Sequence, residues 1–197
     1  METFPVIIAL IGGYLLGSIP FGLLITKATG GGDIREIGSG NIGATNVLRT
    51  GRKELAALTL LLDAGKAAAA LLLVNHFVGA PYGLVAGAAA LIGHCYPIWL
   101  KFDGGKGVAT FFGCLLAAAW PVGLIAAAIW LASAALTRMS SLAALAAAGT
   151  APIVAMILGY TYVGYMAVVL AMVIYIRHRE NIGRILKGTE SKIGKKD

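Results

Sequence analysis

Charge is scarce in this chain. Only 13% of its 197 residues are charged, and 58% are hydrophobic, whereas average soluble domains carry about 25% charged residues. Cysteine is scarce too. Cys95 and Cys114 lie in apolar stretches without C-x-x-C or metal-ligand spacing, so we expect two buried thiols and no metal site. The shortage of charge, together with long apolar runs, predicts an integral membrane protein rather than a soluble domain.

Several familiar signatures are also missing. The N-terminal stretch lacks a basic segment, carries Glu2 and is apolar for longer than the core of a signal peptide, so we expect it to stay as a first membrane span. The chain has no H-x-x-x-x-D dyad and no G-x-S-x-G elbow. Because no protein nucleophile is evident, the pattern favours a reaction whose substrate is already activated.

Apolar runs of roughly 20 residues predict the membrane spans. The run 108–136 is long for one span and short for two. We expect it to form two short helices, each about 20 Å long, that turn at Trp120-Pro121. The other expected spans are 4–26, 55–75, 82–100 and two within 139–176, interrupted at 159–164.

The positions of Lys and Arg fix the expected orientation. If 108–136 is a hairpin, the basic segments 27–53, 101–107, Arg138 and the tail from 177 onward all lie on one side of the membrane. The positive-inside rule then predicts an all-α integral membrane protein with seven transmembrane helices, N-terminus out and C-terminus in. We expect a single domain over 1–197, with 187–197 as a loose basic tail near anionic lipid.

Small residues recur at helical spacing in the expected spans. Gly13/Gly17 and Gly79/Gly83/Gly87 follow the small-xxx-small pattern. The pattern suits either a dimer face or close packing within one chain. We favour packing within the chain and expect a monomer.

Polar residues collect in three segments that this orientation places on the cytoplasmic side. They are G-S-G-N-I-G-A-T-N-V-L-R-T-G-R-K at 38–53, K-F-D-G-G-K-G-V-A-T at 101–110 and R-H-R-E-N-I-G-R at 177–184. The first contains G-x-G-x-x-G, but a dinucleotide site needs a preceding strand and a following soluble helix, which we do not expect here. Its glycines are able to expose N–H groups to an anion instead.

The residues after these glycines predict a short helix that ends at Gly51. That helix would place Thr45, Asn46 and Arg49 on one face, with the Arg49 guanidinium as a phosphate ligand. The alternative is a glycine-rich turn followed by an ordinary cytoplasmic arginine. Both interpretations fit the residues alone.

The second and third segments add a cation and an imidazole. Lys106 is followed by Gly107, so the segment is not a Walker A motif, but glycine N–H groups, a lysine and a helix starting at 108 would suit an anion. His178 and Asn181 are three residues apart and would face one way, in a site or at an ordinary helix end. The roles of four other polar residues stay open: Asp63, Lys66, His94 and Asp103.

Together these motifs resemble a known family. G-S-G-N-I-G-A-T-N-V-L-R, G-G-K-G-V-A-T and H-R-E-N-I-G-R-I-L are similar to the three signature motifs of the acyl-phosphate:glycerol-3-phosphate acyltransferases (PlsY) of bacterial inner membranes. The resemblance implies a multi-pass inner-membrane enzyme of phospholipid biosynthesis with its active site at the cytoplasmic face. It would move a fatty acyl group from acyl phosphate to the 1-hydroxyl of glycerol 3-phosphate, giving lysophosphatidic acid and inorganic phosphate. It implies membrane lipid as a partner, and no cofactor, metal or nucleic acid.

The resemblance also implies residue roles. The loop 104–107 would hold acyl phosphate and stabilise the departing phosphate, and the first segment would hold glycerol 3-phosphate. His178 or a substrate phosphate oxygen would accept the hydroxyl proton. The expected catalytic residues are Ser39, Arg49, Lys106, His178 and Asn181. The expected substrate-binding residues are Gly38, Gly40, Asn41, Thr45, Asn46, Gly104, Gly105 and Gly107.

Two other classes of function are compatible with parts of the sequence. The intramembrane residues Asp63 and Lys66 would suit an anion or organophosphate transporter, although the polar motifs gather on one side and no inverted repeat is visible. A scaffold that only binds anionic lipid would leave the glycine-rich loops without a use.

Overall fold

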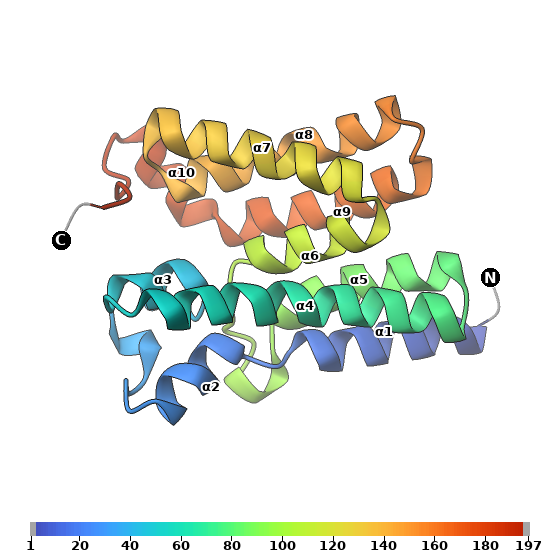
Figure 1. The fold of residues 1–197 in the computed structure, drawn as a ribbon, viewed down its shortest axis with the longest axis horizontal. Coiled ribbons are helices and arrows are strands. Elements are labelled where there is room, and N and C mark those ends of the chain that lie inside the picture. Colours follow the sequence, from blue (N-terminus) through green and yellow to red (C-terminus); the bar gives the residue numbers. More distant parts are fainter. Residues whose placement is uncertain (1–2, 195–197) are drawn as a thin grey trace. The chain divides into compact units, whose positions relative to one another are not determined.

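The computed structural model describes residues 3–194, and each regular element in that range is helical (Figure 1). The expected all-α class is therefore confirmed. The extreme N-terminus and Lys195 and Lys196 of the expected basic tail lie outside the described residues. The elements are α1 (Thr3–Gly17), α2 (Phe21–Ala28), η1 (Ile34–Glu36), α3 (Ala44–Arg49), α4 (Lys53–Phe77), α5 (Ala80–Cys95), η2 (Ile98–Leu100), α6 (Val108–Ala118), α7 (Trp120–Thr137), α8 (Ser140–Ile157), α9 (Thr161–Arg177) and α10 (Arg179–Leu186).

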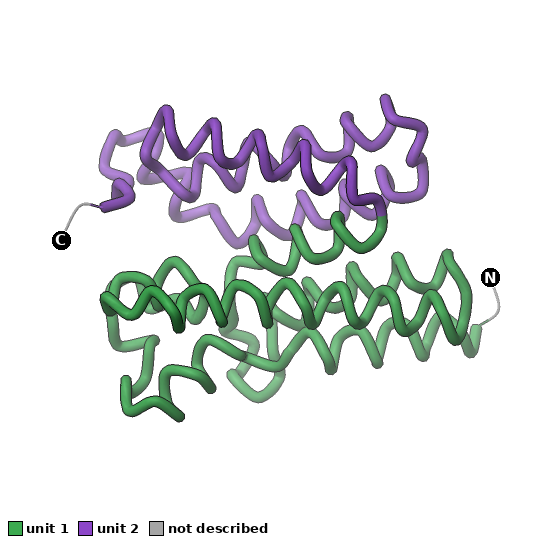
Figure 2. The backbone as a smooth tube through the Cα atoms, viewed as in Figure 1, with its two compact units in different colours: residues 1–118 green, residues 119–197 purple. Residues whose placement is uncertain are grey.

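The chain divides into two compact units, residues 1–118 and 119–197, which Figure 2 colours separately. The boundary falls where Ala119 is extended and Pro121 occupies the first turn of α7. Proline is favoured at that position because its missing N–H costs the helix nothing there. The break that Trp120-Pro121 predicted is confirmed, and the expectation of one domain stays a prediction. Each unit is described by itself below.

In the first unit, α1, α4 and α5 pack against one another, and α6 lies on α4 (Figure 1). Glycine allows α1 and α5 to approach closely. A Cβ built on Gly13 or Gly17 would overlap the backbone of Ala86 or Ala90, and one built on Gly83 would lie 2.8 Å from the Leu71 carbonyl oxygen. The small-xxx-small spacing thus serves packing within the chain, as predicted.

In the second unit, α8 packs between α7 and α9. Alanines of α8, among them Ala147, Ala148 and Ala151, are completely buried at these contacts. The chain bends by 64° between α9 and α10, so that α10 turns back and contacts both α8 and α9. His178 lies at this bend.

Within residues 3–194, five helical segments are long and apolar enough to cross a membrane, and the bent pair α9–α10 makes a sixth. The prediction of two short helices in 108–136 is right for α6 and wrong for α7. α6 has 11 residues, about 16 Å, and α7 has 18, about 27 Å. Seven spans and their orientation stay predictions. The five segments are Thr3–Ala28, Lys53–Phe77, Ala80–Leu100, Trp120–Thr137 and Ser140–Ile157.

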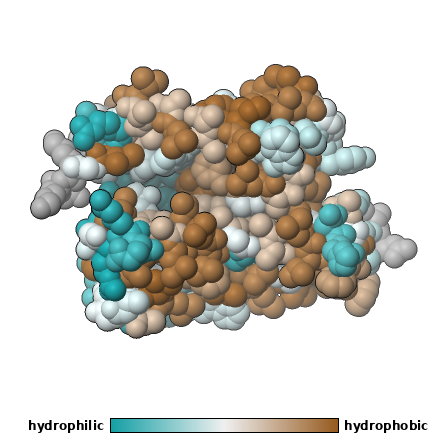
Figure 3. All heavy atoms as spheres, viewed as in Figure 1, coloured by the Kyte–Doolittle hydropathy of each residue, from teal (hydrophilic) through white to brown (hydrophobic). Residues whose placement is uncertain are grey.

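Prolines divide two of the expected spans. The first span is interrupted between Gly17 and Phe21, and Pro20 directly precedes the helix that begins at Phe21. The third span is α-helical only to Cys95, because Pro97 follows. On the face drawn in Figure 3, apolar side chains cover much of the helices and hydrophilic ones gather near helix ends. Leu61 is 68% exposed and Leu136 is 85% exposed, as suits side chains that face lipid.

Candidate active site

The side chain of Asn46 fixes the first loop, residues 37–43, through hydrogen bonds on its buried side. Asn46 is buried, and its amide nitrogen donates to the carbonyl oxygens of Ile34 and Ile37, at 3.0 and 2.9 Å. Its amide oxygen accepts the N–H of Ser39 at 3.1 Å. One side chain thus closes the whole turn. These bonds use the Asn46 amide inside the protein, and its expected contact with substrate stays a prediction.

Arg49 lies across this loop. Gly38 has a positive φ of 55°, and a Cβ built on it would lie 2.6 Å from the Asn46 amide oxygen and 3.3 Å from an Arg49 guanidinium nitrogen. Only glycine at position 38 leaves room for the Asn46 amide and the Arg49 side chain and adopts this positive φ without strain. Thr45 and Arg49 share an exposed face of α3, as predicted, whereas Asn46 faces inward.

Asn41 and Gly40 shape the rest of the first loop. The Asn41 side-chain oxygen accepts the N–H of Gly43 at 2.9 Å, just before α3 begins. This local bond is a typical way for asparagine to form a turn. Gly40 has a φ of 68°, which glycine adopts without strain. Ser39, Gly38 and Gly40 are all exposed, so the loop presents its tip outward.

The second loop, residues 101–107, is built differently from the expected anion nest. The N–H of Gly104 donates to the Cys95 carbonyl at 3.1 Å, and the N–H of Gly105 donates to the His94 carbonyl at 3.0 Å. These bonds use both N–H groups inside the protein, and the expected contact of Gly104, Gly105 and Gly107 with substrate stays a prediction. The features that remain suited to a phosphate are the half-buried Lys106 and the N-terminus of α6.

The two loops belong to one end of the first unit. Ile34, Ile42 and Val47 form a buried hydrophobic cluster with α2 and α4, and Leu100, which precedes the second loop, packs against it. Hydrogen bonding to Asp33, with an added contribution from the negative charge of Asp103, raises the pKa of Arg35. The segments that carry Arg49 and Lys106 thus adjoin one hydrophobic cluster, and a shared site for the two side chains stays a prediction.

His178 belongs to the second unit and is buried at the α9–α10 bend. Its Nδ1 lies 2.8 Å from the carbonyl oxygen of Ile174. A carbonyl only accepts hydrogen bonds, so Nδ1 must carry a proton. In the neutral imidazole the lone pair then lies on Nε2. That arrangement gives the ring the chemical capacity of a general base.

Asn181 is joined to a residue that the sequence prediction missed. Its amide nitrogen donates to Glu190 Oε1 at 2.6 Å, and Ser141 Oγ donates to the same oxygen at 2.7 Å. Arg184 Nε donates to Glu190 Oε2 at 2.8 Å. Burial alone would raise the pKa of Glu190, but these hydrogen bonds outweigh it and hold the pKa below its ordinary value. Glu190 therefore ties Asn181 to α8.

The expectation of a loose tail is wrong for residues 187–194. Glu190 is only 8% exposed, and the N–H of Ile193 donates to the Arg138 carbonyl at 2.6 Å. The signal that could have revealed this is Glu190 itself, a lone acid among the basic residues from 184 to 192. The prediction that His178 and Asn181 meet the two loops stays a prediction.

The fold and these loops define a class: an integral membrane protein of apolar helices whose polar loops carry cations suited to an anionic substrate. The glycerol-3-phosphate acyltransferase family matches residues 7–188, and the chain belongs to this family. The resemblance drawn from the motifs is confirmed.

Curated relatives and solved structures agree with this assignment. Glycerol-3-phosphate acyltransferases of Maricaulis maris (strain MCS10) and Caulobacter vibrioides (strain NA1000 / CB15N) are 63% and 60% identical to this chain. The alignments cover 94% and 96% of this chain and 86% and 88% of those proteins. The crystal structure of PlsY (YgiH), an integral membrane glycerol 3-phosphate acyltransferase, in its glycerol 3-phosphate form matches with a TM-score of 0.89 and 39% identity over 96% of both chains. Its lysophosphatidic acid form matches with a TM-score of 0.88 and 38% identity, over 96% of this chain and 95% of the other. The chain is a membrane acyltransferase of phospholipid synthesis, so the transporter and scaffold alternatives lose their support.

Proposed function

We propose that this chain transfers a fatty acyl group from acyl phosphate to the 1-hydroxyl of glycerol 3-phosphate at the cytoplasmic face of the bacterial inner membrane. Two observations support the acceptor and the product. The similar PlsY structures are a glycerol 3-phosphate form and a lysophosphatidic acid form. The donor is the one that the resemblance to the acyl-phosphate-dependent family implies, and an acyl phosphate is already activated, so its transfer needs no protein nucleophile.

The proposed reaction is a direct displacement at a carbonyl carbon. The 1-hydroxyl oxygen of glycerol 3-phosphate attacks the acyl carbon, and the bond from that carbon to the phosphate oxygen breaks. Inorganic phosphate leaves, and the hydroxyl proton passes to His178 Nε2 or to a phosphate oxygen of the substrate. Positioning two bound reactants contributes about 7–11 kcal/mol to such a reaction, so a protein base is helpful rather than essential.

The observation that carries the proposal is the arrangement of cations in the first unit. Arg49 lies over the Ser39 loop, and Lys106 lies on a loop anchored to the same hydrophobic cluster. Each substrate brings one phosphate. We assign Arg49, with Ser39 and Thr45, to glycerol 3-phosphate, because a guanidinium offers paired donors to phosphate oxygens. Lys106 and the N-terminus of α6 are assigned to acyl phosphate.

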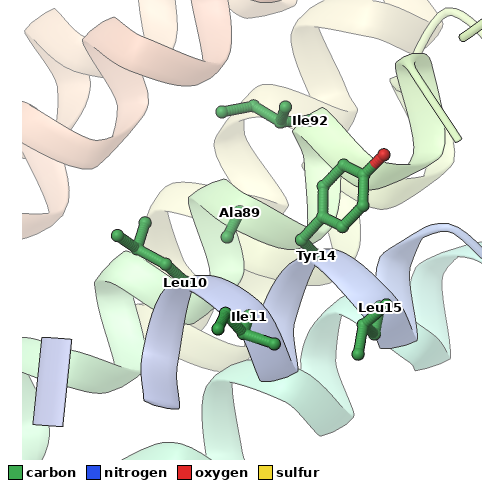
Figure 4. Close-up of a pocket in the computed structure, with 6 residues that line it drawn as sticks. All are labelled: Leu10, Ile11, Tyr14, Leu15, Ala89 and Ile92. Carbon is green, nitrogen blue, oxygen red and sulfur yellow. The ribbon is translucent and has the colours of Figure 1, made fainter. Parts of the chain in front are cut away.

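An apolar hollow offers a place for the acyl chain. It lies between α1 and α5, has a volume of about 320 Å³ and is lined by Leu10, Ile11, Tyr14, Leu15, Ala89 and Ile92 (Figure 4). The Tyr14 hydroxyl donates to the Tyr96 carbonyl at 2.8 Å. Tyr96 directly follows Cys95, whose carbonyl anchors the second loop. The hollow therefore ends near the segment that holds the proposed acyl-phosphate loop.

The test of the reaction is an assay with defined substrates. Purified protein in detergent is mixed with palmitoyl phosphate and glycerol 3-phosphate, and both inorganic phosphate and lysophosphatidic acid are measured. We expect equal amounts of the two products, and neither product when glycerol 3-phosphate is left out. Equal product formation with palmitoyl-CoA in place of palmitoyl phosphate would overturn the proposed donor.

The test of the site uses matched pairs of cations. Arg49→Ala and Lys106→Ala are each expected to lower kcat/KM by at least about 100-fold, because each removes a charge-assisted contact to a phosphate. The controls are Arg52→Ala, whose guanidinium instead donates to the Thr29 carbonyl at 2.9 Å, and Lys101→Ala, whose side chain is exposed. Both controls should retain most activity. A folded Arg49→Ala or Lys106→Ala variant with near-normal kcat/KM would refute the assignment.

A further inference from the structure

Three titratable side chains meet inside the first unit, away from the exposed residues of the two loops. Asp63 and Lys66 belong to α4 and His94 to α5, and none is more than 4% exposed. Lys66 Nζ lies 2.8 Å from Asp63 Oδ1 and 2.9 Å from His94 Nδ1. The same ammonium donates to the carbonyl of Ile19 at 2.7 Å, at the break between α1 and α2. Lys66 thus links three helical segments.

These contacts fix the proton on the His94 ring. An ammonium has three N–H donors and no lone pair, so Nδ1 of His94 must accept the hydrogen bond from Lys66. A proton on Nδ1 would point at an N–H of the ammonium 2.9 Å away, and neither donor would find an acceptor in the other. Nδ1 also lies 3.5 Å from Asp63 Oδ1, but the approach of Lys66 is closer, and we infer a neutral ring with its proton on Nε2. This is the opposite arrangement to His178, whose Nδ1 donates to Ile174.

The other edge of the His94 ring faces the second loop. A Cβ built on Gly105 would overlap Nε2 of His94 and lie 2.7 Å from Cε1. The main chain of the same histidine accepts the Gly105 N–H at 3.0 Å. His94 therefore contacts the loop through both its ring and its backbone. A movement of the His94 ring would therefore displace Gly105 and the neighbouring Lys106.

We propose that the Asp63–Lys66–His94 network positions the acyl-phosphate loop. Lys66 orients the His94 ring and holds its proton on Nε2, Asp63 balances the Lys66 charge, and the ring keeps Gly104–Gly107 in the shape that presents Lys106 to the donor phosphate. His94 acts here as a positioning residue. The proposal rests on the assignment of acyl phosphate to this loop, and it adds three buried residues to the machinery of donor binding.

The first test reads the proton directly and does not depend on any substrate. The chain contains three histidines, His76, His94 and His178, so ¹⁵N-histidine labelling gives a simple NMR spectrum in detergent. At pH 7 we expect one buried ring protonated on Nε2 and another protonated on Nδ1. The double variant Asp63→Asn/Lys66→Met removes both charges together, and it should abolish the fixed Nε2–H form of His94 alone. A His94 ring protonated on Nδ1 in the wild type would overturn the proposal.

The second test separates the two edges of the ring by kinetics. Asn in place of His94 keeps an acceptor near Nδ1 but is too short to reach Gly105, whereas Gln places an N–H near Nε2. His94→Asn should raise KM for palmitoyl phosphate about tenfold, the value of one hydrogen bond or close contact. It should change KM for glycerol 3-phosphate less than twofold. His94→Gln should stay within about threefold of the wild type for both substrates.

The matched control is His76→Asn, because His76 is exposed near the other end of α4. It should leave both KM values unchanged. Equal increases in both KM values for His94→Asn, in a protein with wild-type thermal unfolding, would overturn the positioning role. If the wild type shows no turnover with palmitoyl phosphate, the proposed function fails, and the NMR result still decides the network.

Discussion

Glu190 joins side chains that are far apart in the sequence. It accepts hydrogen bonds from Ser141 on α8 and from Asn181 and Arg184 on α10. Its side chain is 4% exposed, so losing its charge would leave buried donors without their acceptor. The position of the proposed catalytic Asn181 therefore depends on Glu190.

This arrangement predicts an acid-sensitive contribution to stability. The folded-state pKa of Glu190 lies below its ordinary value of 4.5, so its stabilisation is fully present above pH 4.5 and is lost as the pH falls through the folded-state value. Glu190→Gln should cost about 2 kcal/mol at pH 7, a drop of about 4–8 °C in Tm for a chain of this size. The difference from the wild type should shrink on acidification to about pH 3.5. Thermal unfolding in detergent at both pH values measures it.

The control for this variant is Glu180→Gln, since Glu180 is an exposed glutamate on α10, the helix that carries Asn181 and Arg184. It should shift Tm by less than about 1 °C, as surface substitutions usually do. A Glu190→Gln protein as stable as the wild type at pH 7, or one whose deficit grows towards acid pH, would contradict the network.

The limits of prediction at the residue scale follow from sequence separation. The contact between Asp63 and Lys66 was predictable, because residues three apart share a helix face. Its extension to His94 was not, because His94 lies 28 residues further on and another helix brings it there. The contact of Glu190 with Ser141 was missed for the same reason, because 49 residues separate the two. The inward turn of Asn46, on a helix of only six residues, depends on carbonyl groups of the preceding turn.

At the scale of elements, α1 and α5 pack closely against each other through glycines. Gly17 and Gly13 of α1 face the backbone of Ala90 and Ala86, and Gly93 of α5 faces the Tyr14 carbonyl. No side chain fits at these points. In lipid such close backbone approach supplies van der Waals contact that the hydrophobic effect does not.

Two glycines of α1, five residues apart, should therefore respond in opposite directions to alanine. A Cβ on Gly17 would overlap the Ala90 backbone, whereas one on Gly12 meets nothing within 4 Å. Gly17→Ala should lose about 2 kcal/mol by forcing the helices apart. Gly12→Ala should gain about 0.5–1 kcal/mol from helix propensity. Thermal unfolding of both variants in one detergent compares them directly, and a Gly17→Ala protein at or above wild-type Tm would show that the two helices do not meet as described.

Proline sets several element boundaries, but only one of them was predicted from the sequence. The break near Trp120-Pro121 was visible in the sequence because proline begins helices well. The length of α7 was not, because alanine and leucine run on without a stop signal to Thr137. The kink at 18–20 and the early end of α5 were hidden inside apolar runs. A hydropathy profile shows how long an apolar run is, but it does not show where the backbone departs from helical geometry within that run.

At the scale of the whole molecule, the open question of topology depends on α6. Glu36 and Lys187 are separated by six long or apolar helices, α4 to α9. An even number of crossings returns both residues to the same side of the membrane. α6 has only 11 residues, about 16 Å against a hydrocarbon core of about 30 Å. If α6 does not cross, five crossings remain and the two residues lie on opposite sides.

Cysteine labelling of the intact membrane tests this prediction. We expect Glu36→Cys and Lys187→Cys to react with a membrane-impermeant maleimide only after permeabilisation, because the basic segments should face the cytoplasm. His76→Cys and Tyr160→Cys should react in intact cells. All four positions are exposed, and the native Cys95 and Cys114 are buried, which keeps the background low. Labelling of Glu36→Cys and Lys187→Cys from opposite sides would mean that α6 does not cross and that the chain has six spans. Labelling of both in intact cells would reverse the orientation and move the proposed site to the outer face, where cytoplasmic glycerol 3-phosphate could not reach it.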